Sequence, residues 1–312
     1  MRTTKRHWPL LLRFVALLWG LALVAAPAQS ATPPTVLFIG NSFTYAHGSA
    51  ARFYRAHTVT DLNAEGIGGV PALFKAFTQE AGLDYAVSLE TGPAKGFDFH
   101  VQTKGEVIAR PWDFVVAQSY SNLDPRRPGD PTMLLKWGKE LAELLRSKNP
   151  QVDIRLVATW SRADQTYPEK TPWHGQQIEK MALDVRVAYD QLAKLSPAFH
   201  SVIPVGEAWN RAFKAGAADP NPYDGIAFGQ VDLWTFDHFH ASTYGYYLCA
   251  LMVFGDITGL DPRSLGTDER AAFELGLSSA QAEALQRVAA DELATTNGRA
   301  PLKPFKAGKL PR

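Results

Sequence analysis

The stretch Thr35–Tyr45 has the sequence TVLFIGNSFTY, and the interpretation of the whole chain starts from it. Its first half is apolar and rich in β-branched residues, which favours a strand. Gly40 and Asn41 end this strand, because both residue types are typical of turns. The apolar residues do not alternate with polar ones, which predicts a strand buried on both faces of a parallel sheet.

Later segments repeat this pattern of strand and helix. Further strands are predicted at residues 112–119, 153–161 and 199–209. Helices are predicted from apolar spacing at residues 133–148 and 176–195, and a helix with weaker periodicity is predicted at residues 49–57. Buried strands that alternate with helices indicate an α/β fold, a three-layer αβα sandwich around a central parallel sheet. In such a sheet the ligand site lies beyond the carboxyl ends of the strands, so chemistry is expected just after residues 39, 117 and 159.

The two ends of the chain differ from this pattern. Residues 1–30 combine a basic start, an apolar run of 13 residues and a small-residue end, which predicts a cleaved signal peptide and export to the periplasm or beyond. An uncleaved membrane anchor is the alternative, although a bilayer span needs roughly 20 residues. The folded domain is predicted at 31–296, with two short polar helices within 267–294. A loose tail rich in Pro and Lys is predicted at 297–312.

Charge and cysteine content argue against several classes of protein. The chain has 32 Lys and Arg against 31 Asp and Glu, and without residues 1–30 the net charge becomes −3. This balance gives no electrostatic footprint for nucleic acid or for an anionic membrane. The single cysteine, Cys249, lies in the apolar run YYLCALMVF. It is predicted to be a core residue, so neither an internal disulfide nor a cysteine nucleophile is expected.

Ser42, Asp237 and His240 are the residue types that a serine hydrolase needs. A serine hydroxyl becomes nucleophilic when a histidine removes its proton, and a carboxylate holds that histidine in the right tautomer. Ser42 follows the first strand, and Asp237 precedes His240 by three residues in TFDHFHAS. Simpler explanations exist for each part, since GNS is also an ordinary turn and Asp237, His238 and His240 are possible metal ligands. No further cluster with ligand spacing lies nearby, so no metal is expected.

Four segments together resemble the sequence blocks of the SGNH/GDSL hydrolase family. They are FIGNSFTY, GIGGVPAL, VVAQSYS and DHFHAS, in the order of the family's blocks. The resemblance implies a flavodoxin-like SGNH hydrolase fold over most of the chain. It also implies that Ser42 is the nucleophile, that His240 is the general base, and that Asp237 orients His240.

The same resemblance implies an oxyanion hole. Its donors would be the N–H of Ser42, the N–H of Gly69 and the side-chain amide of Gln118. Gln118 departs from the family's pattern, in which an asparagine supplies the amide. The glycine is also open, because Gly68 stands directly before Gly69.

Substrate contacts are predicted for Asn41, Trp160 and Arg162, which follow the ends of predicted strands. Trp160 is equally compatible with a place in the core. His47 lies five residues after Ser42 in the sequence, but it is expected to be a surface or helix-start residue.

The resulting hypothesis is a serine esterase that hydrolyses carboxylic esters through an acyl-enzyme, with no metal and no organic cofactor. Export and the aromatic residues favour carbohydrate O-acetyl esters among small-molecule and carbohydrate substrates. Lipid esterase and acyltransferase activities would use the same residues. The alternative of another class is a non-catalytic carbohydrate-binding or assembly protein on this fold. No nucleic-acid partner and no stable membrane insertion after signal cleavage are expected, and the oligomeric state is left open.

Overall fold

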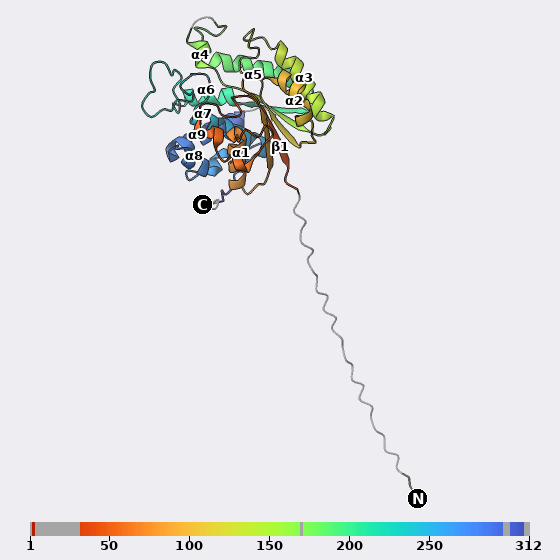
Figure 1. Ribbon diagram of the computed structural model, residues 1–312. Helices are drawn as coiled ribbons and strands as arrows, with labels where there is room; N and C mark the ends of the chain where they lie inside the picture. The colour runs from red at the N-terminus through yellow and green to blue at the C-terminus, as the bar shows by residue number, and fades with distance from the viewer. Residues whose placement is uncertain (1, 4–31, 169–170, 296–299, 309–312) are drawn as a thin grey trace. The chain divides into compact units, whose positions relative to one another are not determined.

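A six-stranded sheet forms the centre of the protein. The computed structural model describes residues 2–3, 32–168, 171–295 and 300–308 (Figure 1). The strands are β1 (Thr35–Gly40), β2 (Thr60–Asp61), β3 (Ala86–Thr91), β4 (Phe114–Ala117), β5 (Asp153–Ala158) and β6 (Phe199–Pro204). Their order is β2-β3-β1-β4-β5-β6, and neighbouring strands are parallel. Apart from the short β2, this is the flavodoxin-like order, whose switch point lies between β1 and β4.

Helices cover both faces of the sheet. They are α1 (Gly69–Glu80), α2 (Phe97–Ile108), α3 (Thr132–Arg146), α4 (Ala163–Thr166), α5 (Glu179–Ala193), α6 (Val205–Lys214), α7 (Thr243–Thr258), α8 (Arg270–Glu274) and α9 (Ser279–Thr295). Helices α2, α3 and α5 share one hydrophobic core with the sheet, and α1, α6, α7 and α9 share the other (Figure 1). The predicted three-layer sandwich with a parallel sheet is confirmed.

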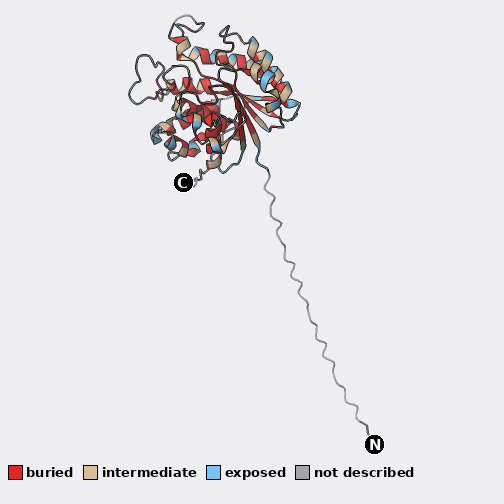
Figure 2. Cartoon of the chain, viewed as in Figure 1, coloured by how far each residue is buried: buried red, intermediate tan, exposed pale blue. Residues whose placement is uncertain are grey.

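Strand β1 shows why its apolar residues do not alternate with polar ones. Val36 and Phe38 belong to the core on the side of α1 and α7, whereas Leu37 and Ile39 belong to the opposite core. All four side chains are completely buried. Figure 2 shows this burial along the sheet and on the inner sides of the helices. A strand covered on both faces needs an apolar residue at every position.

Several elements differ from the sequence predictions. β3 was not predicted, because its sequence AVSLET includes polar residues, yet Glu90 within it is completely buried. α7 was not predicted either, because it is apolar on all sides and lacks a helical period. Residues 49–57 form two 3₁₀ turns, η1 (Ala50–Phe53) and η2 (Ala56–Thr58), in place of one α-helix. Arg55 separates the two turns with a left-handed φ of 39°.

The C-terminal segment packs against the domain over its described part. The backbone of Lys303 donates to Gly259 and accepts from Asp261, both at 2.9 Å. Phe305 lies against Phe254 with ring centroids 5.8 Å apart. Residues 300–308 are therefore held by α7 and the turn that follows it, and they are not the loose tail predicted from composition.

The predicted signal peptide falls almost entirely outside the described residues. Within the ranges that are described, no helix combines the length and the apolar character that a bilayer span requires. The prediction that Cys249 is a core residue is confirmed. Cys249 is buried within α7, and burial raises its pKa to about 12.

Candidate active site

Ser42 lies immediately after β1, and Asn41 fixes the loop that carries it. The Asn41 side-chain amide donates to the carbonyls of Lys95 at 2.8 Å and Ser119 at 3.2 Å. Its oxygen accepts the N–H of Phe43 at 3.1 Å. Asn41 therefore joins the end of β1 to the loops that follow β3 and β4. Its polar atoms are used by this scaffold, although the residue also lines the cavity described below.

Gln118 supports the same loop from β4. Its Oε1 accepts the N–H of Asn41 at 3.1 Å and the hydroxyl of Thr44 at 3.2 Å, and its Nε2 donates to the carbonyl of Ser119. The side chain is only 2% exposed and does not line the cavity beside Ser42. The side-chain atoms of Gln118 are thus used to hold the nucleophile loop, and its predicted place in an oxyanion hole is not supported.

The glycine pair of the second sequence block is also structural. Gly68 donates its N–H to the carbonyl of Arg52 at 2.8 Å. Gly69 has a φ of +62°, and a Cβ there would lie 2.7 Å from the carbonyl oxygen of Thr44. Glycine lets α1 approach the nucleophile loop closely at this point. Neither glycine lines the cavity, so the predicted oxyanion role of Gly69 is not supported.

A cavity of about 300 Å³ opens beside Ser42 at the carboxyl ends of the strands. Its lining residues are Asn41, Ser42, Phe43, Tyr45, His47, Pro93, Ala94, Tyr120, Ser121, Asn122, Pro125, Arg162, Phe239 and His240. The loops after β1, β3, β4 and β5 thus all contribute to it, together with the segment before α7. This is the edge of the sheet at which the strand order predicts a ligand site.

Asn122 is a candidate site residue that was not predicted from the sequence. It lies four residues after Gln118 on the loop following β4, and it lines the cavity that contains Ser42. Its side-chain amide has no hydrogen-bond partner among the described residues, and neither does the N–H of Ser42. The sequence did contain a signal for Asn122. An asparagine is the residue type that the SGNH pattern expects, and Asn122 directly follows the block VVAQSYS.

His240 and Asp237 form a hydrogen-bonded pair at the cavity wall. Nδ1 of His240 lies 2.6 Å from Oδ2 of Asp237. Oδ1 of Asp237 accepts the backbone N–H groups of Phe239 and His240, each at 2.9 Å. This turn fixes both the carboxylate and the imidazole, and it leaves Nε2 of His240 as the ring nitrogen without a partner in the described part of the chain.

The electrostatics of this pair favour a neutral imidazole beside an ionised carboxylate. Burial lowers the pKa of His240, the interaction with Asp237 raises it, and the electrostatic influence of His47 and Arg162 lowers it further. Burial raises the pKa of Asp237, but the hydrogen bonds from His240 and Phe239 outweigh it, so the pKa falls below its ordinary value. A neutral histidine with a bound, charged carboxylate behind it is suited to accept a proton.

Phe239 and His47 flank the His240 ring on two sides. The Phe239 ring centroid lies 4.0 Å from that of His240, and the His47 centroid lies 4.6 Å from it. The hydroxyl of Tyr246 donates to the carbonyls of Ser42 at 3.1 Å and His47 at 3.3 Å. His47 also lines the cavity, whereas a surface or helix-start histidine was expected.

The other two residues predicted to contact substrate, Arg162 and Trp160, lie in different surroundings. Arg162 lines the cavity, as expected. Trp160 does not, because it is completely buried between Phe43 and Trp209, with ring centroids 4.3 Å and 4.8 Å away. Trp160 packs behind the cavity wall as a core residue, which was the alternative, and its predicted contact with substrate is not supported.

Strained backbone is concentrated around the cavity. Among described residues other than glycine, those with a left-handed φ include Ala46 (63°), Ala94 (55°), Leu123 (71°) and His238 (54°). Each of these lies in the cavity wall or is a sequence neighbour of a lining residue. Such conformations are costly for residues with a Cβ and persist where the surrounding structure enforces them, often at functional sites.

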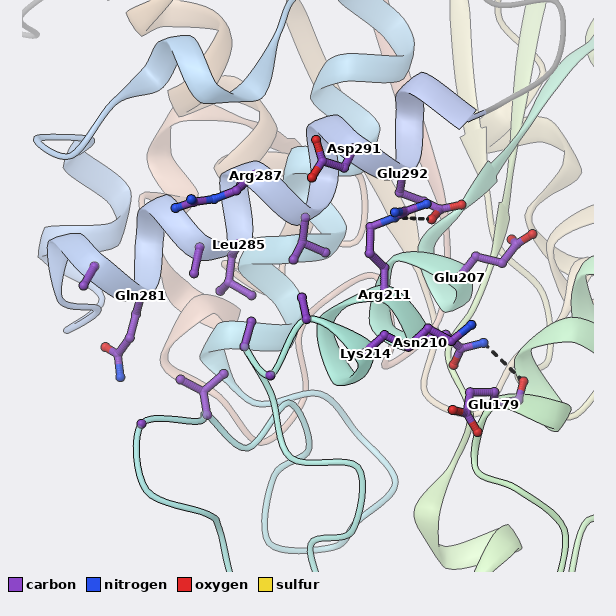
Figure 3. A pocket seen from close by; sticks show the side chains of 18 of the residues that line it. Glu179, Glu207, Asn210, Arg211, Lys214, Gln281, Leu285, Arg287, Asp291 and Glu292 are labelled. Carbon is purple, nitrogen blue, oxygen red and sulfur yellow. Dashed lines mark hydrogen bonds and ion pairs between the residues drawn. The ribbon is translucent and has the colours of Figure 1, made fainter.

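A larger cavity of about 840 Å³ lies elsewhere, between α6 and α9 (Figure 3). The ion pair Arg211–Glu292, at 2.7 Å, lies at its wall, and Asn210 donates to the carbonyl of Glu179 at 3.3 Å. None of its described lining residues is a serine, cysteine or histidine. The described lining therefore offers no serine or cysteine nucleophile with a histidine base. The described ranges also contain no cluster of three His, Cys, Asp or Glu residues that could hold a metal ion.

Comparisons with known proteins support the fold. Neither a family model nor a curated protein sequence matches this chain. Among solved structures, a DUF4886 family protein from Bacteroides uniformis is 18% identical with a TM-score of 0.60, over 86% of this chain and 98% of that one. A protein from Parabacteroides merdae, described as a "putative GDSL-like lipase", is 18% identical with a TM-score of 0.51, over 72% and 95% of the two chains.

These identities establish a common fold and leave the activity open. The likeness extends over 86% and 72% of this chain in the two comparisons. The sheet order and the matched structures agree with the resemblance of the sequence blocks. The chain has the fold of the SGNH/GDSL hydrolases.

Proposed function

We propose that this protein is a serine esterase with Ser42 as nucleophile, His240 as general base and Asp237 as its orienting carboxylate. The observation that carries the proposal is convergence on one cavity: Ser42, the His240 ring and the unpaired amide of Asn122 all line it. Asp237 lies behind the imidazole at hydrogen-bonding distance from Nδ1. Three chain segments that are distant in sequence thus supply the groups for acyl transfer.

In the proposed mechanism, Nε2 of His240 accepts the proton of the Ser42 hydroxyl as its oxygen attacks the ester carbonyl. Asp237 holds the other ring nitrogen and stabilises the imidazolium that forms. The N–H of Ser42 and the side-chain amide of Asn122 donate to the oxyanion of the tetrahedral intermediate. His240 then protonates the leaving alcohol, and a water molecule activated by the same imidazole releases the acyl group from Ser42.

The size of the cavity favours a short acyl group. Its volume of about 300 Å³ is at the lower end of the range for ligand sites. An acetyl group fits such a site better than a long lipid chain does. Together with the predicted export, this supports carbohydrate O-acetyl esters as the substrate class, with acyltransferase and lipid esterase activities as the competing possibilities.

The test compares p-nitrophenyl acetate hydrolysis by the wild type, Ser42→Ala and Ser121→Ala. Ser121 lines the same cavity but has no catalytic role in the proposal, so it controls for loss of a serine hydroxyl. We expect Ser42→Ala to lose several orders of magnitude in kcat, and Ser121→Ala to stay within about one order of magnitude. A chelator should leave the wild-type rate unchanged. Equal slow turnover by the wild type and Ser42→Ala would favour a non-catalytic binding protein.

A further inference from the structure

Over its described lining, the cavity beside Ser42 has basic side chains but no acidic ones. None of the described residues that line it is an aspartate or a glutamate, whereas Arg162, His47 and His240 are all basic. The carboxylates nearest in sequence lie behind these side chains: Asp237 against His240, and Asp164 against Arg162. A substrate inside the cavity would therefore meet hydrogen-bond donors and the positive charge of Arg162, while the carboxylate that pairs with Arg162 lies outside the lining.

Arg162 stands close to the proposed general base. Its guanidinium carbon lies 3.5 Å from the Phe239 ring centroid, and that centroid lies 4.0 Å from the His240 ring centroid. These two distances put the guanidinium no farther than about 7.5 Å from the His240 ring. An ester held for attack by Ser42 is thus within reach of Arg162 through one of its substituents.

The guanidinium is held in one orientation, and part of it is unused. Nε and Nη2 donate to the two oxygens of Asp164 at 3.0 Å and 2.6 Å, and the flat face rests on Phe239. Nη1 has no hydrogen-bond partner among the described residues. The side chain is 13% exposed. A planar cation fixed by a bidentate pair, with a free N–H edge, is suited to bind a carboxylate.

The position of Arg162 also indicates which part of the ester it meets. His240 must protonate the leaving oxygen, so the alcohol portion of the substrate lies on the His240 side of the cavity. Phe239 and Arg162 continue from His240 on that side. Resting on the esterase function proposed above, we propose that Arg162 determines specificity by binding a carboxylate on the alcohol portion of the ester. For a carbohydrate ester, the substrate would be an O-acylated acidic sugar.

The experiment compares two acetate esters that differ in one charge: 4-acetoxybenzoate and its methyl ester. Both transfer the same acetyl group, and each rate is divided by the rate of base hydrolysis of that ester. We expect the wild type to prefer the anionic ester in kcat/KM, and Arg162→Gln to reduce this preference by about tenfold or more, as loss of a hydrogen bond to a charged group would.

Arg263→Gln is the matched control. Arg263 also forms a bidentate pair with an aspartate two residues away, Asp261, but it does not line the cavity. Its substitution should leave the preference unchanged. In Arg162→Gln, the carboxylate of Asp164 loses its ion-pair partner and could itself repel the anionic ester. The double variant Arg162→Gln/Asp164→Asn removes this negative charge as well, and it should also lose the preference. An equal preference for the anionic ester in the wild type and in both Arg162 variants would overturn the proposal.

A binding measurement separates this proposal from the esterase function. Calorimetry on Ser42→Ala compares 4-hydroxybenzoate with its methyl ester, which need no turnover. We expect the anion to bind at least about tenfold more tightly, and the gain to vanish when Arg162→Gln is added. Equal binding of the two ligands would overturn the anionic subsite even if esterase activity is found. Preferential binding of the anion without Ser42-dependent turnover would overturn only the esterase.

Discussion

Two pairs of histidine and carboxylate in this molecule have the same local chemistry and different surroundings. In the first, Nδ1 of His240 contacts Asp237 at the wall of the cavity. In the second, Nδ1 of His100 on α2 contacts Glu90 at the end of β3. Both side chains of the second pair are completely buried, and Nε2 of His100 has no hydrogen-bond partner in the described structure.

The comparison shows that a histidine held by a carboxylate is not by itself a catalytic unit. The Glu90–His100 pair fixes α2 to the sheet, and Glu90 also accepts from Asn63 at 3.3 Å, which ties down the loop after β2. No substrate can reach its free ring nitrogen. The Asp237–His240 pair has a serine, an unpaired amide and a cavity on its free side, and these surroundings make it a candidate for proton transfer.

The largest expected difference between the pairs is in activity. His240→Ala should lower kcat by about 10⁴-fold or more, because the members of a triad act as a unit. His100→Ala should keep activity in the fraction that remains folded, since His100 does not reach the cavity. Steady-state kinetics on protein checked by circular dichroism would measure both. Comparable losses of kcat in the two folded variants would remove the distinction.

For stability, the Glu90–His100 pair is expected to matter more than the Asp237–His240 pair. Glu90→Ala leaves a buried histidine without its partner and should cost about 3–5 kcal/mol in the free energy of unfolding. Asp237→Ala removes a partly exposed partner and should cost less, about 1–2 kcal/mol. Urea unfolding of both variants measures this. The double variant Glu90→Leu/His100→Leu serves as the control, since removal of both polar partners should recover part of the loss.

Substitution of Asn122, the proposed oxyanion donor, should lower activity while both histidine–carboxylate pairs stay intact. Asn122→Ala should lower kcat by about 10²–10³-fold with little change in unfolding free energy. Asn221→Ala, on an exposed loop outside the cavity, is the matched control and should retain wild-type kinetics. Full activity in Asn122→Ala would show that the oxyanion is stabilised by other groups.

The smallest expected effect is a shift in the pKa of His240. The electrostatic influence of His47 helps to lower the pKa of His240. His47→Phe keeps a ring at this position but removes this electrostatic influence, so the pKa of His240 should rise. Because the neutral imidazole is the active form, activity would then be lost at a higher pH on the acidic side of the pH–rate profile. His57→Phe, at an exposed position, should leave that profile unchanged, and a shift to lower pH in His47→Phe would contradict the assignment.

The sequence was sufficient for the fold and for the order of the proposed catalytic residues. β1, β4 and β5 could be predicted, because strands covered on both faces have largely apolar sequences. β6 was predicted as well, but the predicted strand at residues 199–209 extends into α6, which begins at Val205. β3 could not be predicted, because Glu90 is buried through its contact with His100 on the following helix, which the composition of the strand does not encode. Its absence from the prediction also hid the loop after it, which contributes Pro93 and Ala94 to the cavity.

The details of the site were less predictable, since they depend on where each side chain turns. Gln118 and Asn122 stand four residues apart on one loop, and sequence position alone favoured the first. Gln118 turns inward to hold Asn41 and Thr44, whereas Asn122 lines the cavity. Trp160 was equally compatible with core and site, and only its stacking between Phe43 and Trp209 decides for the core.

The most direct test is covalent labelling by a fluorophosphonate, which reacts with serines that an imidazole activates. Intact mass and peptide mapping would locate and count the label in the wild type, His240→Ala and His100→Ala. We expect one label on Ser42, formed orders of magnitude more slowly in His240→Ala and at nearly the wild-type rate in folded His100→Ala. A label on another residue, no label, or equal labelling rates in the wild type and His240→Ala would contradict the proposed role of Ser42 and His240.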